Sequence, residues 1–181
     1  MKYLFYKIWR NKVLIKLFGR GELFRLLFNL SPMYKNTGGK LIRVSDDLHY
    51  IKVQLLFNYK TRNYVGTIYG GHMYSSIDGI YVIQLIHILG DNYIVWDKSA
   101  KIKFKRPASK TLFADFKITP ELVAQIKIDL QKEKKKDYNF FINLTDLNGD
   151  VYAEVEKVIY IASKEYYKAK KINSAIMKFN K

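Results

Sequence analysis

Asp78 is the residue whose type and position in this sequence point most clearly to chemistry. It is the single carboxylate in residues 72–89, HMYSSIDGIYVIQLIHIL, a segment that contains no lysine or arginine. A carboxylate placed among apolar side chains is costly unless it has partners or a function. The pair Gly70-Gly71 directly precedes the segment, and Asn63 lies in a turn before it. We therefore take Asp78 as the main candidate functional residue.

The segment that carries Asp78 has the length and composition of a helix. Its apolar run begins after a glycine turn and ends at Gly90-Asp91-Asn92, as expected for a helix with a C-terminal glycine cap. Apolar residues fall on nearly every side of such a helix, which indicates burial rather than an amphipathic surface position. We predict one long, buried helix over residues 72–89.

The segments on both sides of this helix have the alternation typical of strands. Predicted strands cover residues 40–44, 49–57, 93–106, 112–118, 138–145 and 151–162, the last two forming a hairpin around residues 146–150. A short helix is expected at 121–131, with Thr119 as its cap ahead of Pro120, followed by a solvated loop at 132–137. The order of elements predicts an α+β fold in which an antiparallel sheet wraps a long central helix.

The predicted strand 93–106 is expected to have one apolar and one polar face. The apolar face consists of Ile94, Trp96, Ala100, Ile102 and Phe104, and the opposite face carries Val95, Asp97, Ser99, Lys101, Lys103 and Lys105. We therefore expect Trp96 to be a core or interface residue, and the three lysines to line a solvent-facing edge.

The composition excludes several kinds of site. The chain has no cysteine, which rules out disulfides, thiolate metal ligands and a cysteine nucleophile, and its three histidines are scattered at positions 49, 72 and 87. No metal site is expected. The net charge of +16 predicts affinity for polyanions, whether a phosphate-bearing ligand, a nucleic acid or an anionic membrane face.

The chain is expected to consist of one domain, residues 36–164, with a basic helical N-terminal extension (1–35) and a basic C-terminal tail (165–181). Residues 1–30 mix apolar side chains with seven basic residues and have no uninterrupted apolar run, so no signal peptide or spanning helix is predicted. A helix broken near Gly19–Gly21 is expected there. It either packs on the domain or a partner subunit, or rests on an anionic bilayer through Trp9 and Phe5.

The run Asn63-x2-Gly66-x2-Tyr69-Gly70-Gly71-x6-Asp78 resembles the signature of hotdog-fold acyl-CoA thioesterases of the phenylacetyl-CoA (PaaI-like) type. That family shows Asn, then His-Gly-Gly six residues later, then Asp or Glu nine residues after the histidine. The similarity covers roughly residues 36–163, includes Arg106-Pro107-Ala108, and is closest to an uncharacterised bacterial branch of the fold.

The resemblance implies a role for each matching residue. Asp78 would be the catalytic nucleophile or general base, and the backbone N–H of Gly71 at a helix N-terminus would bind the thioester carbonyl and its oxyanion. Asn63 would orient the carbonyl or the water, from the neighbouring subunit of a homodimer that pairs through the sheet and could pair further into a tetramer. Further residues are expected at the substrate: Gly70, Tyr69, His72, Asp97, Lys98, Lys103, Lys105 and Arg106.

The sequence departs from the family pattern at two positions. Tyr69 stands where the family has its histidine, and a phenol does not simply replace an imidazole. Asp97 stands where some members have a Ser or Thr that holds the water, so a second carboxylate would repel Asp78 unless Lys98 neutralises it.

Each candidate also has a structural interpretation. Asn63 is a common turn residue, the glycine pair starts a helix, and His72 and His87 are expected to be satisfied polar groups rather than catalysts. Three functions remain open: a cytoplasmic thioesterase that acts on acyl-CoA or acyl-carrier protein and needs no cofactor beyond its coenzyme A substrate, a non-catalytic module that binds acyl chains or an anionic membrane, and nucleic-acid binding. The last is expected least, because the sequence has no recognition motif.

Overall fold

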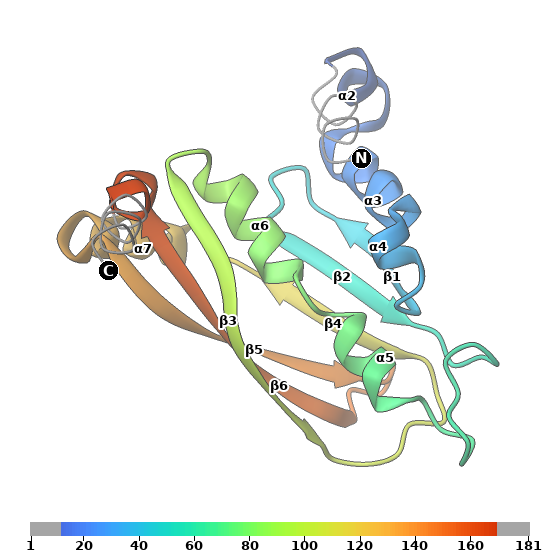
Figure 1. The fold of residues 1–181 in the computed structure, drawn as a ribbon. Coiled ribbons are helices and arrows are strands. Elements are labelled where there is room, and N and C mark those ends of the chain that lie inside the picture. The colour runs from blue at the N-terminus through green and yellow to red at the C-terminus, as the bar shows by residue number, and fades with distance from the viewer. Residues whose placement is uncertain (1–11, 170–181) are drawn as a thin grey trace, which may run out of the picture.

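A computed structural model describes residues 12–169 of the chain (Figure 1). Its helices are α2 (Lys12–Phe18), α3 (Arg20–Leu30), α4 (Pro32–Lys35), α5 (Gly70–Ser75), α6 (Ile80–Leu89) and α7 (Pro120–Glu133), and residues 164–169 are also helical. Its strands are β1 (Gly39–Val44), β2 (Tyr50–Leu55), β3 (Tyr93–Phe104), β4 (Leu112–Lys117), β5 (Lys135–Thr145) and β6 (Val151–Ser163). The N-terminal residues 1–11 and residues 170–181 lie outside this description.

The six strands form one antiparallel sheet in the order β1-β2-β4-β5-β6-β3. The sheet curves around α6, which lies across its concave face with α5 following the same side (Figure 1). This is the α+β hotdog arrangement that the sequence predicts. The hairpin β5–β6 turns at residues 146–150, also as predicted.

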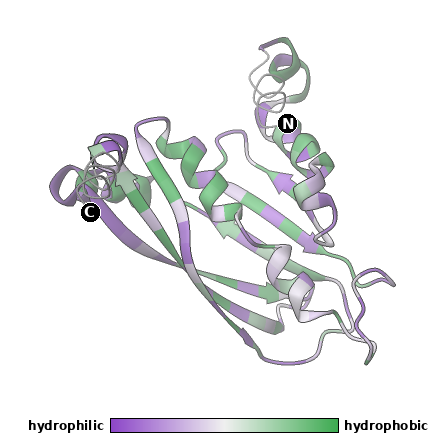
Figure 2. Ribbon diagram, viewed as in Figure 1, coloured by the Kyte–Doolittle hydropathy of each residue, from purple (hydrophilic) through white to green (hydrophobic). Residues whose placement is uncertain are grey.

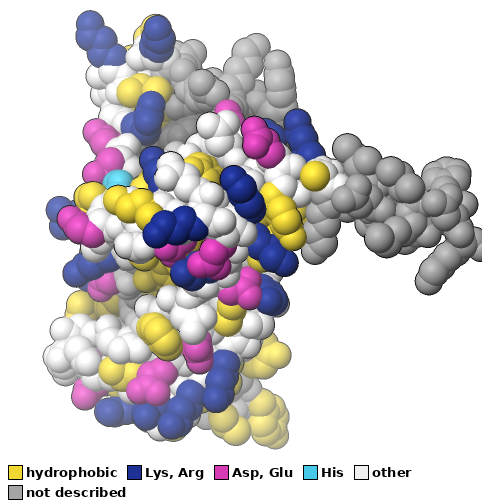
Figure 3. Space-filling model, turned by 90° about the vertical axis from the view of Figure 1, so that its left-hand side faces the viewer, with side chains coloured by type: hydrophobic (Ala, Val, Ile, Leu, Met, Phe, Trp, Pro, Cys, Tyr) yellow, Lys and Arg dark blue, Asp and Glu magenta, His cyan; other side chains and the backbone are white. Residues whose placement is uncertain are grey.

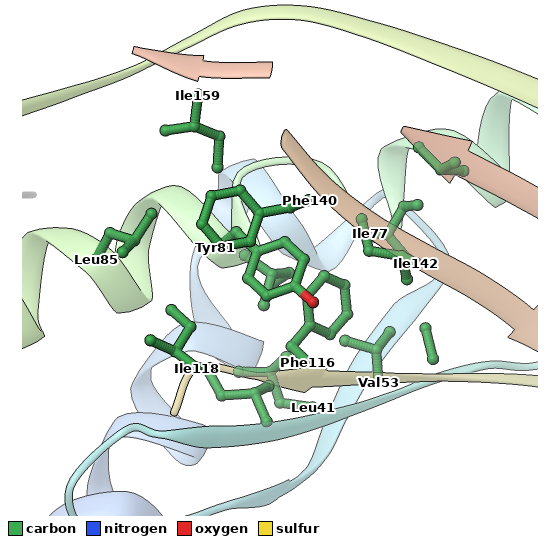
Figure 4. Close-up of a cluster of buried hydrophobic side chains, with 14 of the residues drawn as sticks. Leu41, Val53, Ile77, Tyr81, Leu85, Phe116, Ile118, Phe140, Ile142 and Ile159 are labelled. Carbon is green, nitrogen blue, oxygen red and sulfur yellow. The ribbon is translucent and has the colours of Figure 1, made fainter. Parts of the chain in front are cut away.

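The core fills the space between α6 and the sheet. Tyr81 of α6 lies between Phe116 of β4 and Phe140 of β5, with ring centroids 4.9 and 4.6 Å apart (Figure 4). Rings at such separations gain stabilisation beyond the area that they bury. Figure 2 shows α6 as mostly hydrophobic and α5 as near neutral. The core therefore holds α6 firmly and leaves α5 closer to solvent.

The predicted single helix over residues 72–89 is wrong in one respect, since it is two helices. Helix α5 ends at Ser75, α6 begins at Ile80, and Gly79 between them has φ of 75°, a left-handed conformation that interrupts a helix. The C-terminal cap is confirmed, because Gly90 ends α6 with φ of 81°. Asp78 thus lies at a break between two helices rather than inside one, and it is exposed rather than buried.

The predicted division of strand 93–106 into two faces is also wrong, because β3 contains a β-bulge. Asp97 pairs with Ile159 but Ser99 pairs with Val158, so Lys98 is an extra residue and the side-chain alternation changes phase there. On the core side lie Val95 and Asp97 before the bulge, and Ala100, Ile102 and Phe104 after it. Trp96 is exposed on the opposite face instead of joining the core.

The N-terminal helices differ in how they are attached. Helix α3 packs on β1 and contributes Leu23, Phe24 and Phe28 to the core, whereas α2 has no buried residue. The break between them is at Gly19, as predicted. Among the described residues, none of the helices combines the length and hydrophobicity needed to cross a bilayer.

The region around α7 is more regular than predicted. Thr119 caps the helix by accepting a hydrogen bond from the N–H of Leu122, as expected. The predicted loop 132–137 is reduced to Lys134, because α7 continues to Glu133 and β5 begins at Lys135. Lys136 forms ion pairs with Asp129 and Glu133 of α7 at 3.1 and 3.4 Å, which explains how a lysine-rich segment is accommodated in a strand.

Candidate functional site

Asp78 forms an ion pair with Lys157, a residue that the sequence analysis did not single out. The Nζ atom of Lys157 lies 2.5 Å from Oδ1 of Asp78. The two side chains differ sharply in exposure, since Lys157 is 1% exposed and Asp78 is 47% exposed. The ammonium is therefore inside the domain, while the carboxylate that it binds reaches the surface.

Asp97 binds the same ammonium. Its Oδ1 lies 2.9 Å from Nζ of Lys157. The bulge in β3 makes this possible, because the change of phase turns Asp97 toward the core side while Lys98 points elsewhere. The predicted repulsion between Asp78 and Asp97 is thus offset by a buried cation between them.

The third side of the ammonium faces an aromatic ring. Nζ of Lys157 lies 5.6 Å from the centroid of the Tyr74 ring, within the range of a cation–π interaction. Burial by itself lowers the pKa of Lys157, but its hydrogen bonds and charge interactions with Asp78 and Asp97 outweigh burial, so its pKa lies above the usual lysine value. Lys157 is therefore protonated at neutral pH.

The pKa of Tyr74 is also raised, first by burial. The charge of Lys157 opposes this increase, and the nearby Asp78 and Asp97 add to it. Tyr74 therefore remains a neutral phenol beside the carboxylates. Asp78, Asp97, Lys157 and Tyr74 form a compact group, which we call the carboxylate–lysine cluster.

The glycine pair begins α5, and Gly71 precedes Asp78 by seven residues. Tyr69 is the N-cap residue and gives no side-chain hydrogen bond to the helix. A Cβ atom on Gly70 would lie 2.8 Å from the Phe104 ring, and one on Gly71 would lie 2.3 Å from the Tyr69 ring. At both glycines an aromatic ring thus occupies the place of a Cβ atom, so a larger residue would force an exposed ring to move.

Asn63 organises its own loop. Its Oδ1 accepts hydrogen bonds from the N–H groups of Val65 and Thr67 at 3.1 and 3.0 Å, and its Nδ2 donates to Oγ1 of Thr67 at 2.9 Å. Within one chain the amide thus has a structural role. Its approach to Asp78 of a second subunit stays a prediction.

His72 links α5 to the turn before β1. Its Nδ1 lies 2.8 Å from the carbonyl oxygen of Thr37, and since a carbonyl only accepts, Nδ1 carries a proton. The Tyr69 ring meets the His72 ring edge-on at 5.9 Å. His72 and Tyr69 therefore lie beside the glycine pair, and His72 is held by a backbone partner, while their contact with a substrate stays a prediction.

The basic residues predicted at the substrate lie along and after β3. Lys98 does not neutralise Asp97, which corrects one expectation: it pairs with Asp137 of β5 at 2.5 Å. Lys105 pairs with Glu154 at 3.3 Å and Arg106 with Asp150 at 3.5 Å, and all of these side chains are well exposed. Lys103 is exposed as well. Their contact with a phosphate-bearing ligand stays a prediction.

Of the residues predicted from sequence, the structure brings Asp78 and Asp97 together. The structure adds Lys157, whose core-facing position could have been inferred from the alternation of buried and more exposed residues along β6. Ala153, Val155, Ile159 and Ile161 occupy every second position of the strand and are buried, so the residue at 157 must face the core with them. A lysine at such a position indicates a buried ionic partner.

Solved structures share this fold. A Pseudomonas aeruginosa protein of unknown function, PA5026, described as a probable thioesterase, is 19% identical and superposes with a TM-score of 0.67 over 77% of this chain and 93% of its own. The thioesterase HI1161 of Haemophilus influenzae is 11% identical, with a TM-score of 0.57 over 79% and 90% of the two chains. A Chlorobaculum tepidum protein of unknown function, OLEI01261, is 10% identical, with a TM-score of 0.61 over 77% and 92%.

These likenesses show the fold. A comparison with curated protein sequences finds no match. A family model described as "Domain of unknown function (DUF4442)" matches residues 20–161, which include α3, the whole sheet except the last residues of β6, and the carboxylate–lysine cluster. Since the match spans most of the sequence, the chain belongs to the DUF4442 family, whose domain here has the hotdog fold.

Proposed function

We propose that this protein hydrolyses an acyl thioester carried by coenzyme A or by an acyl-carrier protein. Asp78 acts as the nucleophile or as the general base toward water, and the N–H of Gly71 binds the oxygen of the thioester carbonyl as negative charge develops on it. No cofactor takes part, and coenzyme A enters only as part of the substrate.

One observation carries the proposal: the Asp78 carboxylate is fixed but accessible. Its Oδ1 is bound to Lys157, while the side chain as a whole is 47% exposed, so the carboxylate is held in place and still reaches the surface. The start of α5, on the N-terminal side of Asp78, has backbone N–H groups with no side-chain cap. A fixed carboxylate and uncapped amides are the two kinds of group needed to attack a carbonyl carbon and to hold its oxygen.

We expect a homodimer that forms through β3. This strand is twelve residues long, lies at an edge of the sheet, and pairs only with β6 among the described residues. A long strand with one free edge is a template for pairing with another chain. In the dimer, Asn63 of one subunit would reach Asp78 of the other, and further pairing into a tetramer is an additional prediction.

Turnover tests the proposal directly. Purified protein is offered a panel of short, long and aromatic acyl-CoA thioesters, and Asp78→Ala is measured beside it. Asp115→Ala, an exposed carboxylate on β4, serves as the matched control. We expect hydrolysis by the wild type and the control and none by Asp78→Ala. Equal turnover by Asp78→Ala, or no turnover by the wild type on any thioester, contradicts the proposal.

The dimer is tested by single cysteines, because the natural chain has none. Ser99, Lys101 and Lys103 are changed to cysteine one at a time along β3, and Leu147, exposed at the β5–β6 turn, is the control. If two copies of β3 pair about a two-fold axis, oxidation links the chains at the position nearest the axis. Covalent dimers at Leu147 only, or at no position, would argue against pairing through β3.

The shared site is tested by mixing two inactive variants. A mixed dimer of Asn63→Ala and Asp78→Ala chains contains one intact site if the two residues act across the interface, and none if they act within one chain. Subunit exchange between equal amounts of the two variants should restore up to about a quarter of the wild-type activity, because half of the dimers are mixed and each of these has one intact site of two. Continued inactivity with proven exchange would place Asn63 elsewhere.

A second candidate, contact with an anionic membrane, is favoured by α2. This helix has no buried residue, and its Leu17 and Phe18 are exposed beside Lys12 and Lys16. We expect salt-sensitive binding to anionic vesicles that Leu17→Glu/Phe18→Glu removes and neutral vesicles do not support. Deleting residues 1–30 is not a suitable test, because Phe24 and Phe28 belong to the core.

Nucleic-acid binding has less support. On the face shown in Figure 3, lysine and arginine side chains are scattered among aspartate and glutamate rather than gathered in one patch. A nucleic-acid interface is expected to concentrate positive charge along one face.

A further inference from the structure

The lysine of the carboxylate–lysine cluster stands at a core-facing position, where an apolar residue is expected. Lys157 occupies a core-facing position of β6, between the buried Val155 and Ile159. A buried ion pair is weak support for stability, and apolar residues of similar size often replace one without loss. The charge at position 157 is therefore better explained by what it does to its partners.

Lys157 cannot itself meet a substrate. Its ammonium group has three N–H donors. One is directed at Asp78, at 2.5 Å, one at Asp97, at 2.9 Å, and the remaining side faces the Tyr74 ring. With 1% of the side chain exposed, no part of it is open to a ligand. Any effect on a reaction must pass through the carboxylates.

The two carboxylates differ in their exposure and in the element that carries them. Asp78 is 47% exposed and stands at the helix break after the glycine pair, whereas Asp97 is 33% exposed and comes from the bulge of β3. With both carboxylates ionised, the cluster carries one net negative charge. Without the ammonium, two carboxylates would share the site and repel each other, which favours protonation of one of them.

We propose that Lys157 is the positioning residue of the site: it binds Oδ1 of Asp78 and places a positive charge between this partly exposed carboxylate and Asp97. Its role in turnover rests on the proposed thioesterase function. Asp97 of β3 also binds this ammonium and helps to hold it in place. The position of Asp78 therefore depends on Asp97 as well as on Lys157. The groups that face Asp78 are thus Lys157 from β6, Asp97 from β3 and Tyr74 from α5.

The test uses Lys157→Met, which keeps the length of the side chain and removes the charge. The titration of the Asp78 carboxyl is followed by carbon-13 NMR, with Asp78→Asn used to identify its signal. We expect the midpoint of this titration to rise in Lys157→Met, because the carboxyl loses the positive charge beside it. An unchanged midpoint overturns the proposal.

Turnover gives the second readout. In Lys157→Met, kcat should fall while KM changes little, and the acidic limb of the pH profile should move to higher pH together with the NMR midpoint. A purely structural lysine would lower the amount of folded protein but would leave the limb in place. A lower kcat with an unmoved limb therefore contradicts the positioning role.

A second pair of variants covers the case in which Lys157→Met does not fold. In Lys157→Met, Asp97 is left as a carboxylate without its cation, and Asp97→Asn removes that carboxylate. The single variant Asp97→Asn is therefore compared with the double variant Asp97→Asn/Lys157→Met. The difference between the two is the lysine alone, and the double variant should titrate Asp78 at the higher pH. Equal midpoints overturn the proposal.

The two proposals fail in different ways. If the wild type hydrolyses no thioester but the Asp78 titration depends on Lys157, the thioesterase function is wrong and the charge control by Lys157 stands. If the wild type is active but neither the titration nor the pH profile responds to Lys157→Met, the positioning role is wrong and the thioesterase function stands.

Discussion

Replacing Gly79 by alanine should destabilise the protein, although glycine-to-alanine changes usually stabilise helices. Gly79 has φ of 75°, and a Cβ atom there would have no heavy atom within 4 Å. The cost is therefore conformational rather than steric, and a left-handed residue other than glycine costs about 1–2 kcal/mol. For a chain of this length, we expect the midpoint of thermal unfolding to fall by about 2–8 °C.

The opposite result is expected if residues 72–89 form one continuous helix. In that case alanine replaces glycine in a helix interior and stabilises the protein by about 1 kcal/mol. Urea unfolding of Gly79→Ala therefore separates the two structures by the sign of the change. Gly79→Asn is the matched control, because asparagine adopts the left-handed conformation more readily, and it should cost less than alanine. A Gly79→Ala variant more stable than the wild type would refute the helix break at Asp78.

Three further outcomes are expected. Burial lowers the pKa of His87 to about 4. Since the unfolded chain takes up that proton near pH 6.5, the stability of the wild type should fall relative to that of His87→Gln as the pH drops from about 6.5 to about 4. An equal pH dependence of the two unfolding free energies, measured in urea, would contradict this. Gly71→Ala should destabilise the protein slightly, because its Cβ would lie 2.3 Å from the exposed Tyr69 ring and force this ring to move, and Tyr69→Ala should remove most of that cost in a double-mutant cycle. Thr119→Ala removes the hydrogen bond to the Leu122 N–H and should cost about 1 kcal/mol in chemical unfolding, whereas no loss would mean that the cap is not formed in solution.

Much of the fold could be predicted because the signals are local and repeated. The alternation of apolar residues located the strands, Thr119-Pro120 marked the start of α7, and Gly90 marked the end of α6. The hairpin of β5 and β6 followed from the turn residues between them. These features depend on neighbours in the sequence, which is why a sequence pattern can reveal them.

The helix break and the bulge were missed for different reasons. The Asp78-Gly79 dipeptide is a turn signal, but the strong apolar pattern on both sides of it suggested a continuous helix. The bulge at Lys98 has no comparable signal, because it depends on how β3 meets β6. Its effect is large, since it sends Trp96 to the outer face and turns Asp97 toward Lys157.

Lys157 was missed because it lies 79 residues from Asp78 in the sequence. The position could have been recognised as core-facing from the alternation of β6, but its partners could not. Asp78 and Asp97 come from a helix break and a bulge, and only the fold brings them to one ammonium. The sequence could therefore point to Asp78 as a candidate, but it could not show that Asp78, Asp97 and Lys157 form one cluster.

The most direct measurement is the release of coenzyme A thiol from acyl-CoA by the wild type and by Asp78→Asn. Because the chain has no cysteine, a thiol reagent detects the product without background from the protein. Asp78→Asn keeps the shape of the side chain and a hydrogen-bond acceptor for Lys157 but removes the reactive carboxylate. We predict a loss of at least about 100-fold in kcat. Thiol release at the wild-type rate by Asp78→Asn would contradict the central claim that this carboxylate performs the chemistry.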